Sequence, residues 1–431
     1  MKISTRNLSY EDVLKLPRLT HKKPMKPSRL LATVVRIASM PTLMKTKFSY
    51  TTERMELVQD KPCLILMNHC SFTDMKLAYG IFYPKRFGIV TSVDAMSGVL
   101  GKLMRFLGCT PTHKYITDIS LIKDLEYMLK TNKTSVLMYP EAGYSFDGRA
   151  TALPRKMGVL MKRLGVPVVT VITQGAFARD PLYNMLQIRD VQVSAHVKCI
   201  ATAEEVKEKS VAELDALLQE SFSFDNFAWQ RDNKISIDVP FRADGLHRIL
   251  YKCPCCGEEN QMEGKGIHLT CHACGKKWEM DEYGQMAACD GETEHAHIPD
   301  WYAWQRECVR KEIEAGTYLL DTDVDIAVQV NLDGVCMIGQ GHLTHDANGF
   351  HLTGGDGKLD YKQSALASHT LYADYYWYEI ADTIGIGDTE FSYFCFPKTN
   401  TSVTKARLAT EELYKIKKYE RRKSAKAENG C

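Results

Sequence analysis

The chain has 431 residues and a formal net charge of +2, and 45% of its residues are hydrophobic. A chain of this length exceeds one ordinary hydrophobic core, so we expect two to three domains. The composition excludes collagen-like and largely disordered proteins. The near-neutral charge argues against a dedicated nucleic-acid binder.

The first region, residues 1–50, is predicted to be a basic, membrane-proximal arm. Residues 1–47 hold eleven Lys or Arg against two acids, Glu11 and Asp12. That balance suits an anionic lipid surface, although a solvated tail would have the same composition.

Within this arm, residues 30–44 are apolar but fall short of the roughly 20 residues that a membrane-spanning helix needs. Arg36 and Pro41 also interrupt the stretch. It is suited either to the headgroup interface or to packing on its own domain. No secretory leader pattern is evident, so we expect a cytoplasmic protein, peripheral on the inner face of the membrane.

Residues 51–240 alternate predicted strands and helices. The expected strands are 61–67, 87–93, 134–139 and 166–173, and the expected helices are 71–82, 99–107, 119–131 and 153–164. This alternation predicts an α/β layered domain with a mostly parallel sheet.

The C-terminal part changes character after a cysteine module at 250–280 and a predicted helix at 301–315. Residues 320–420 read as a small β-rich domain closed by a helix at 402–418. The expected short strands are 324–330, 334–340, 341–344, 349–352, 375–379 and 390–397. Their order is loosely similar to a pleckstrin-homology-like architecture.

A candidate catalytic pair lies between the first predicted strand and helix, where Asn68, His69, Ser71 and Asp74 occur. A neutral His can remove the proton of an attacking hydroxyl, and a neighbouring carboxylate can orient its ring. Placed in a loop and a first helical turn, His69 and Asp74 can face each other. The plainer alternative is a loop His and an Asp that merely favours a helix N-terminus.

These residues fit the block Asn-His-x-Ser-x-x-Asp, and Pro140, Glu141 and Ser145 fit a later block. A β-branched run with a proline at 166–171 and the segment 101–114 stand where two further blocks belong. The chain therefore resembles the glycerolipid acyltransferase superfamily, which includes 1-acylglycerol-3-phosphate O-acyltransferases and lysophospholipid acyltransferases.

The resemblance implies a role for each matched residue and a class of substrates. His69 and Asp74 would be catalytic, and the substrate-binding residues would include Asn68, Ser71, Glu141 and Ser145. The donor would be an acyl-CoA or an acyl-carrier-protein thioester, and the acceptor hydroxyl would belong to a lysophospholipid or a glycerol phosphate. Phospholipid biosynthesis is the implied process.

One departure leaves the acceptor open. The family's Arg in the later block, which is thought to hold the acceptor phosphate, is Tyr144 here. A phenol cannot replace the bidentate grip of a guanidinium. Either Arg149, the first choice, or Lys114, Arg105 or Lys102 takes over, or the acceptor is not a simple glycerol phosphate. Arg149 could equally be a solvated loop charge.

The cysteine module contains two Cys-x2-Cys knuckles, formed by Cys253 with Cys256 and by Cys271 with Cys274. A Gly follows each knuckle and permits the tight turn. Four thiolates suit tetrahedral Zn²⁺ with no open position, so a zinc ribbon with a structural metal is predicted. Cys255 is expected to be a bystander.

The rival function is a non-enzymatic zinc-ribbon protein that binds a nucleic acid or a protein partner. Four Lys in 250–280 are balanced by four Glu, which is poor for phosphate binding, so no nucleic-acid partner is expected. A third possibility is that the ribbon and tail dock a carrier protein or a membrane beside an active acyltransferase.

Overall fold

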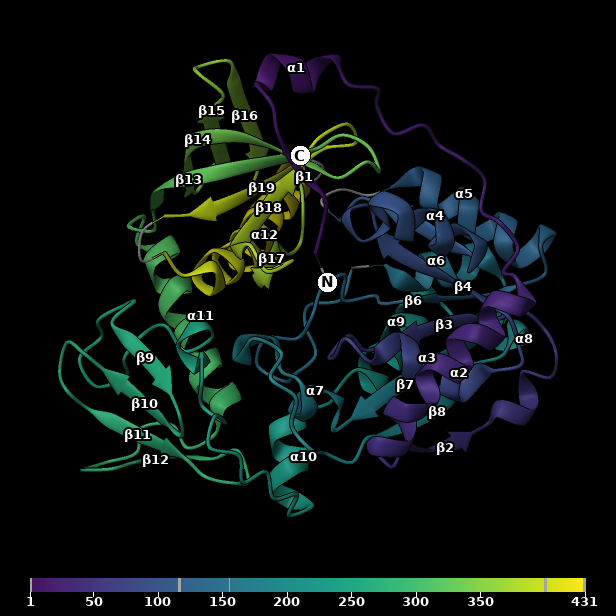
Figure 1. Cartoon of the computed structure of the whole chain (residues 1–431), viewed down its shortest axis with the longest axis horizontal. Helices are drawn as coiled ribbons and strands as arrows, with labels where there is room; N and C mark the ends of the chain where they lie inside the picture. Colours follow the sequence, from purple (N-terminus) through teal and green to yellow (C-terminus); the bar gives the residue numbers. More distant parts are fainter. Residues whose placement is uncertain (1, 115–117, 155, 399–400, 429–431) are drawn as a thin grey trace.

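The computed structural model describes residues 2–114, 118–154, 156–398 and 401–428, the last four by their backbone alone. An α/β layered half lies beside an antiparallel sheet, and a small cysteine-bearing sheet lies below that antiparallel sheet (Figure 1). None of the described helices is long and apolar enough to cross a membrane.

The α/β half is built on a seven-stranded sheet of order β2-β8-β7-β3-β6-β4-β5. Its strands are β2 (Ser49–Glu53), β3 (Leu64–Met67), β4 (Phe87–Ser92), β5 (Cys109–Thr112), β6 (Ser135–Met138), β7 (Val168–Gln174) and β8 (Ser194–Ala201). The mostly parallel sheet expected from the sequence is in fact mixed, because β8 runs antiparallel to β7. The other five pairings within the described strands are parallel.

Helices cover both faces of this sheet, which explains why β3 is apolar at all four positions. Ile65 and Met67 pack toward the side of α2 and α3, whereas Leu64 and Leu66 pack toward the side of α5, α6 and α9. The helices are α2 (Arg29–Lys45), α3 (Asp74–Phe82), α4 (Gly98–Phe106), α5 (Ile119–Glu126), α6 (Met157–Leu164), α7 (Ala176–Arg179), α8 (Ala203–Glu208), α9 (Val211–Ser221) and α10 (Asn226–Asp232).

The cysteine-bearing sheet has the order β12-β11-β10-β9, and all its pairings are antiparallel. It consists of β9 (Met262–Lys265), β10 (His268–Cys271), β11 (Lys277–Met280) and β12 (Met286–Ala288). The buried pair Trp278 and Trp301 ties this sheet to α11 (Ile298–Glu314), since their rings meet edge to face at 5.1 Å.

The C-terminal half is β-rich, with an eight-stranded sheet of order β16-β15-β14-β13-β19-β18-β17 and β1 paired beside β14. Its strands are β1 (Thr5–Asn7), β13 (Leu320–Gln329), β14 (Val335–Asp346), β15 (Gly349–Gly354), β16 (Leu359–Ser364), β17 (Tyr372–Trp377), β18 (Ala381–Gly387) and β19 (Ser392–Pro397). The two strands expected at 334–344 are the single strand β14. The likeness to a pleckstrin-homology-like architecture stays a prediction.

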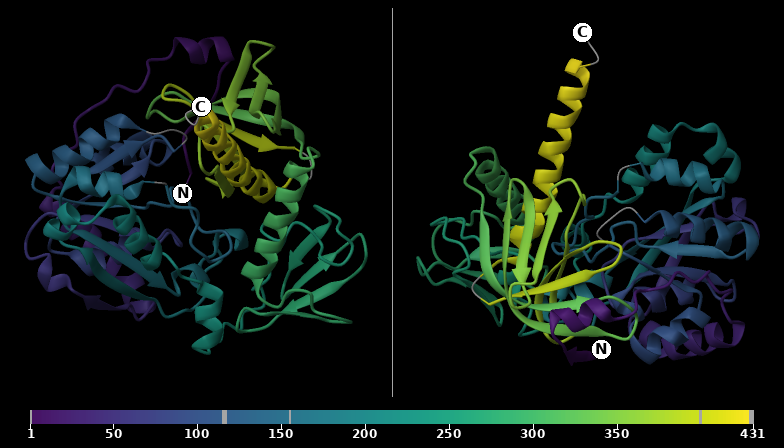
Figure 2. Two further views of the ribbon diagram at one scale, coloured as in Figure 1. Left: turned by 180° about the vertical axis from the view of Figure 1, so that it is seen from behind. Right: turned by 90° about the horizontal axis from the view of Figure 1, so that it is seen from above.

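A long helix, α12 (Val403–Glu428), follows this sheet and runs past the end expected at residue 418. Its first half packs on β17 and α11, and its second half extends away from the body (Figure 2). Residues 415–424 of that second half carry six Lys or Arg and one Glu.

The residues expected to form one basic arm are divided between the two halves. β1 pairs in parallel with β14, and Tyr10 of α1 (Tyr10–Lys15) exchanges a 3.1 Å hydrogen bond with Tyr393. α2, by contrast, packs on α3 of the α/β half. The chain thus begins on one half and crosses to the other. The domain boundaries drawn from the sequence stay a prediction.

Candidate active site

The candidate residues collect at one edge of the α/β sheet. The loops after the parallel strands β3, β4, β5 and β6 begin at this edge, and they carry the 68–74 segment, Asp94, Lys114 and the 139–145 segment. Carboxyl ends of parallel strands meet at a common edge, where open α/β sheets place their ligand sites. The sheet topology therefore brings together segments that lie up to 77 residues apart.

His69 and Asp74 face each other from a loop and a first helical turn, the placement in which we expected them to meet. The Nδ1 atom of His69 lies 2.8 Å from Oδ2 of Asp74, which opens helix α3. The same carboxylate oxygen accepts hydrogen bonds from the backbone N–H groups of Cys70 (3.0 Å) and Ser71 (3.2 Å). Asp74 is therefore fixed by backbone N–H groups of the loop, and its carboxylate favours the His69 tautomer that carries the proton on Nδ1.

Burial lowers the pKa of His69, and the hydrogen bond with Asp74 opposes this effect. The charge of Lys114 lowers the pKa of His69 further. The imidazole is consequently neutral at neutral pH, which is the form that a general base requires.

Two tyrosines flank the His69 ring. Tyr139 stacks on one side at a centroid distance of 4.1 Å, and Tyr144 stacks at 3.8 Å. Phe72, half of which is exposed, extends the stack beyond Tyr144 at 5.1 Å. Tyr144 thus occupies the place of the missing Arg as an aromatic wall. This role was not predicted, because a residue that departs from a motif does not indicate what it contacts.

Glu141 and Ser145 tie the second block to the first. The fully buried carboxylate of Glu141 accepts hydrogen bonds from the backbone N–H of His69 (3.0 Å) and of Thr151 (2.7 Å). Burial raises the pKa of Glu141 to about 7. The Ser145 N–H donates to the carbonyl of His69 (3.0 Å), and its hydroxyl donates to the carbonyl of Arg149 (2.6 Å). Both residues hold the loop that carries His69 in place.

Asn68 and Ser71 are also bonded to the protein. Asn68 Oδ1 accepts from the Thr173 N–H at 2.9 Å and from its hydroxyl at 3.0 Å. Ser71 Oγ donates to Asp180 Oδ1 at 2.5 Å. The substrate-binding roles predicted for these residues, and for Glu141 and Ser145, stay predictions.

Arg149, the first choice for binding the acceptor phosphate, already has its charge paired with two carboxylates of the protein. Its guanidinium pairs with Asp225 and Asp300, both at 2.8 Å. It lines a cavity of about 170 Å³ with Arg306 and Arg407, which have carboxylate partners of their own. A phosphate would have to compete with these ion pairs, and a phosphate-binding role for Arg149 stays a prediction.

Lys114 follows β5, and its charge lowers the pKa of His69. Its Nζ lies 4.0 Å from the ring centroid of Tyr372, which belongs to β17 of the C-terminal half. Tyr372 and Tyr378 both donate hydrogen bonds to Asp94 Oδ2, at 2.9 and 3.1 Å. The C-terminal half therefore reaches the catalytic edge. The aromatic run at residues 372–378 was the available sequence signal for this contact.

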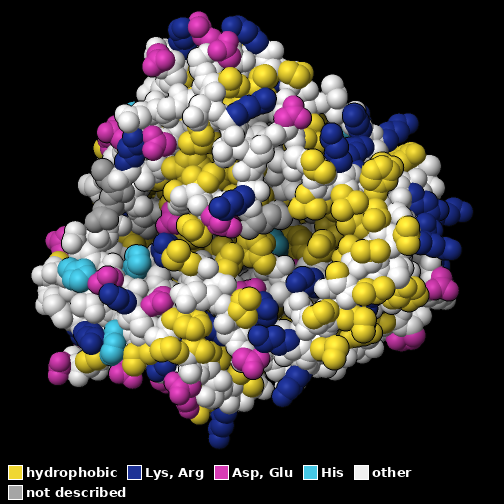
Figure 3. Space-filling view, in the orientation of Figure 1, with side chains coloured by type: hydrophobic (Ala, Val, Ile, Leu, Met, Phe, Trp, Pro, Cys, Tyr) yellow, Lys and Arg dark blue, Asp and Glu magenta, His cyan; other side chains and the backbone are white. Residues whose placement is uncertain are grey.

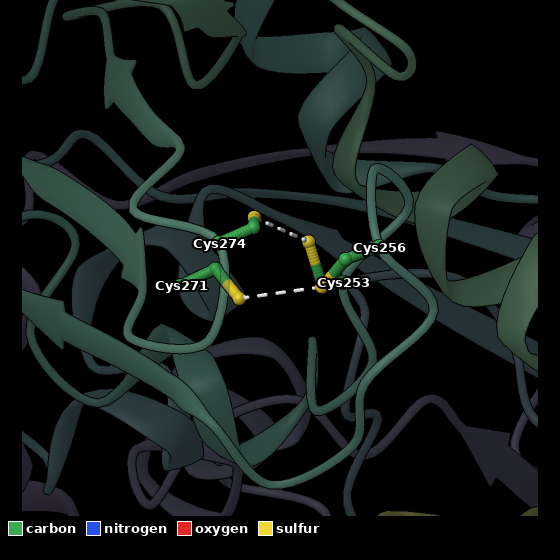
Figure 4. Close-up of side chains that lie close together, drawn as sticks. All are labelled: Cys253, Cys256, Cys271 and Cys274. Carbon is green, nitrogen blue, oxygen red and sulfur yellow. Dashed lines mark hydrogen bonds between the residues drawn. The ribbon is translucent and has the colours of Figure 1, made fainter.

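The four predicted metal ligands come together as two facing knuckles (Figure 4). All four Sγ atoms lie within 4.8 Å of one another, and the Cys253–Cys274 and Cys256–Cys271 separations are both 3.8 Å. Thiolates at about 2.3 Å from a tetrahedral Zn²⁺ would be about 3.8 Å apart, so the set fits this ion.

The backbone around these cysteines fits as well. Gly257 and Gly275 adopt φ values of +80° and +78°, and each donates its N–H to the carbonyl of the first Cys in its knuckle. A left-handed turn of this kind favours glycine.

Residues 49–174 match the family model described as Acyltransferase. Among solved structures, the 1-acyl-sn-glycerophosphate (LPA) acyltransferase PlsC from Thermotoga maritima aligns with 45% of this chain and 80% of its own chain. The sequence identity is 15% and the TM-score is 0.34. No curated protein matches the sequence.

Proposed function

Because residues 49–174 match the Acyltransferase family model, we propose that the protein moves a fatty acyl group from a thioester to a lipid hydroxyl. The donor is an acyl-CoA or an acyl-carrier-protein thioester. The acceptor is a lysophospholipid or a glycerol-phosphate-type molecule. The observation that carries the proposal is the neutral, Asp74-oriented imidazole of His69 at the carboxyl edge of the sheet.

In the proposed reaction, Nε2 of His69 removes the acceptor hydroxyl proton while the hydroxyl oxygen attacks the thioester carbonyl. The carbon–sulfur bond then breaks, and the thiol leaves with the proton that His69 returns. Asp74 stabilises the imidazolium that forms between these events. Tyr139 and Tyr144 hold the ring between them and exclude water from its faces.

We further propose that the enzyme works while docked on the inner face of a membrane. One side of α2 exposes Leu30 (75%), Val34 (52%), Ile37 (60%) and Met44 (73%). α4 adds Val99 (84%) and Phe106 (49%), and apolar side chains gather over this part of the molecule (Figure 3). An apolar helix face edged by Lys and Arg suits a headgroup interface. The opposite side of α2 packs on the protein through Ala32, Ser39 and Leu43. The helix can therefore contact its own domain and a membrane at the same time.

We propose that Zn²⁺ occupies the four-cysteine cluster in a structural role. Cys253, Cys256, Cys271 and Cys274 would hold the ion, and with four protein ligands it would have no open position for catalysis. When bound, it would cross-link the two knuckles at one end of the small sheet.

An acceptor panel tests the proposed function. The purified protein is incubated with palmitoyl-CoA, and thiol release is followed with and without lysophospholipids or glycerol 3-phosphate. We expect release that depends on an acceptor and a matching diacyl or monoacyl product by mass spectrometry. If no acceptor stimulates release, with either the CoA or the carrier-protein thioester, the proposal is wrong. The zinc-ribbon alternative would then gain support from binding to a protein or a nucleic acid.

A further inference from the structure

The C-terminal half contributes a polar cluster to the catalytic edge, which we call the β17 cluster: Asp94, Lys114, Tyr372, Asp374 and Tyr378. Asp94 and Lys114 follow β4 and β5, whereas the other three residues belong to β17 and the turn after it. Asp94 is buried, and the remaining four are half-buried.

The β17 cluster adjoins the reacting groups. Nζ of Lys114 lies 4.0 Å from the ring centroid of Tyr372, and Asp374 lies two positions further along β17, on the same face of the strand. The charge of Lys114 also lowers the pKa of His69. A second contact holds the two halves together here, since the Phe146 and Tyr375 rings lie 4.6 Å apart. A headgroup attached to a hydroxyl at His69 would therefore meet residues of both halves.

The charges of the β17 cluster do not suit a phosphomonoester dianion. Its one cation, Lys114, interacts with two carboxylates, Asp94 and Asp374, which oppose the lowering of its pKa by burial. Burial raises the pKa of Asp374 to about 7, against the effect of Lys114 and of a hydrogen bond from the Tyr375 N–H. A dianion at Lys114 would face this carboxylate without a second free cation in the cluster.

The same charges complement a zwitterion. A phosphodiester carries one negative charge, which Lys114 can pair with. An adjacent ammonium can pair with Asp374 and would favour its ionised form over the protonated form that burial promotes. The rings of Tyr372 and Tyr378 add faces that attract an ammonium ion. A headgroup with both charges close together thus satisfies the cation and the carboxylate at once.

The backbone of the β17–β18 hairpin has the strained conformations that are common at binding sites. The β17–β18 pairing shifts register between Asp374 and Trp377. Tyr376, Tyr378 and Glu379 adopt positive φ values of 50°, 48° and 66°. Left-handed conformations in bulky residues are strained, and such strain concentrates at binding and active sites.

We propose that Asp374 of the C-terminal half is a specificity-determining residue of the acceptor site, which with Lys114 selects lysophospholipids whose headgroup is zwitterionic. Lys114 binds the phosphodiester and Asp374 binds the ammonium. This inference rests on the proposed acyltransferase function and names its acceptor class. It assigns the recognition of the acceptor to β17, outside the acyltransferase-family domain.

The test compares three acceptors of equal acyl chain with palmitoyl-CoA as donor: lysophosphatidylethanolamine, lysophosphatidylglycerol and lysophosphatidate. We expect wild-type kcat/KM to be about tenfold higher or more for the ethanolamine lipid than for the other two. Equal values, or a preference for lysophosphatidate, would overturn this inference and leave the acyltransferase proposal intact. Activity with none of the three, nor with glycerol 3-phosphate, would instead contradict the function itself.

Variants of Asp374 test the residue directly. We expect Asp374→Asn to raise KM for the ethanolamine lipid about tenfold with little change in kcat, and to leave lysophosphatidate turnover unchanged or faster. Asp374→Glu should keep the preference. The matched control is Glu379→Gln, which removes an exposed carboxylate of the same hairpin that pairs with Lys2. If D374N lowered activity with all acceptors equally, Asp374 would have only a structural role.

A second neutral variant, Asp374→Ser, guards against a folding defect of D374N. If neither neutral variant folds, the wild-type acceptor preference alone decides the inference.

Discussion

The loop 68–74 and strand β17, which we propose to form two sides of one site, are built in different ways. In the loop, the buried carboxylates of Asp74 and Glu141 receive backbone N–H groups and leave little freedom for His69. β17 is an edge strand with a register shift, and its polar side chains are half-buried. In the proposals made above, the rigid α/β half carries out the reaction and the C-terminal half selects the acceptor.

The largest effect should come from the base itself. Replacing His69 with Ala should lower kcat by about 10²–10⁴-fold, because general-base catalysis contributes this much. Thiol release in the presence of an acceptor is the measurement. His196→Ala is the matched control, since this exposed histidine pairs with Glu53 on another face. Equal turnover of wild type and H69A would remove His69 from the mechanism.

The next effect concerns the ribbon rather than the reaction. Cys253→Ser should abolish zinc binding and destabilise the protein by several kcal/mol, because metal binding and folding are coupled in such modules. Zinc content by atomic emission and the thermal midpoint report the change. Cys255→Ser, which alters the exposed neighbouring thiol, should change neither. If both variants lost the metal alike, the knuckle assignment would be wrong.

A smaller effect should follow from loosening the catalytic loop. Glu141→Gln places an amide NH₂ group among N–H donors, which costs about 1–3 kcal/mol and should lower kcat about tenfold. The acceptor KM should change little, because the carboxylate is buried and bonded to the backbone. Steady-state kinetics of E141Q beside the exposed control Glu220→Gln checks this. A rise in KM alone would assign Glu141 to substrate binding instead.

The pH dependence of kcat/KM tests whether the charge of Lys114 lowers the pKa of His69. His69 acts as a base only when neutral, so a lowered pKa extends activity toward acidic pH. Lys114→Met removes a charge that lowers this pKa, so the acid limb of kcat/KM should move to higher pH. Glu141 titrates in the same range in both proteins, which makes the difference between them the measurement. Lys123→Met, an exposed change on α5, should leave the profile where it is.

The smallest effect is expected at Tyr144. Tyr144→Phe keeps the stack on His69 and Phe72, so kcat should stay within about threefold of wild type. Tyr144→Ala removes the stack, worth about 0.5–1.5 kcal/mol, and should lower kcat by up to about tenfold. If Y144F were as impaired as Y144A, the hydroxyl rather than the ring would be the working group.

Much of the α/β half could be predicted because its signals are local. The apolar run at β3 and the periodic helix faces follow from periodicity, since a strand buried on both faces has few polar positions. The antiparallel direction of β8 was not predicted, because the residues 194–201 carry no signal for the direction in which this strand pairs with β7. The pairing of β1 with β14 joins residues about 330 positions apart and has no local pattern at all.

The amino-acid sequence by itself determined the two sets of reactive side chains, because each set lies within a short segment. His69 and Asp74 are five residues apart, and the two cysteine knuckles span 22 residues. A loop and a turn suffice to bring such groups together. Only the tertiary structure decided what surrounds them: Tyr144 on the His69 ring, Glu141 beneath the loop, and the β17 cluster across the site. The first two contacts depend on β6 lying beside β3 in one sheet, and the third depends on how two sheets pack. Packing is set by the summed fit of many side chains rather than by any one motif.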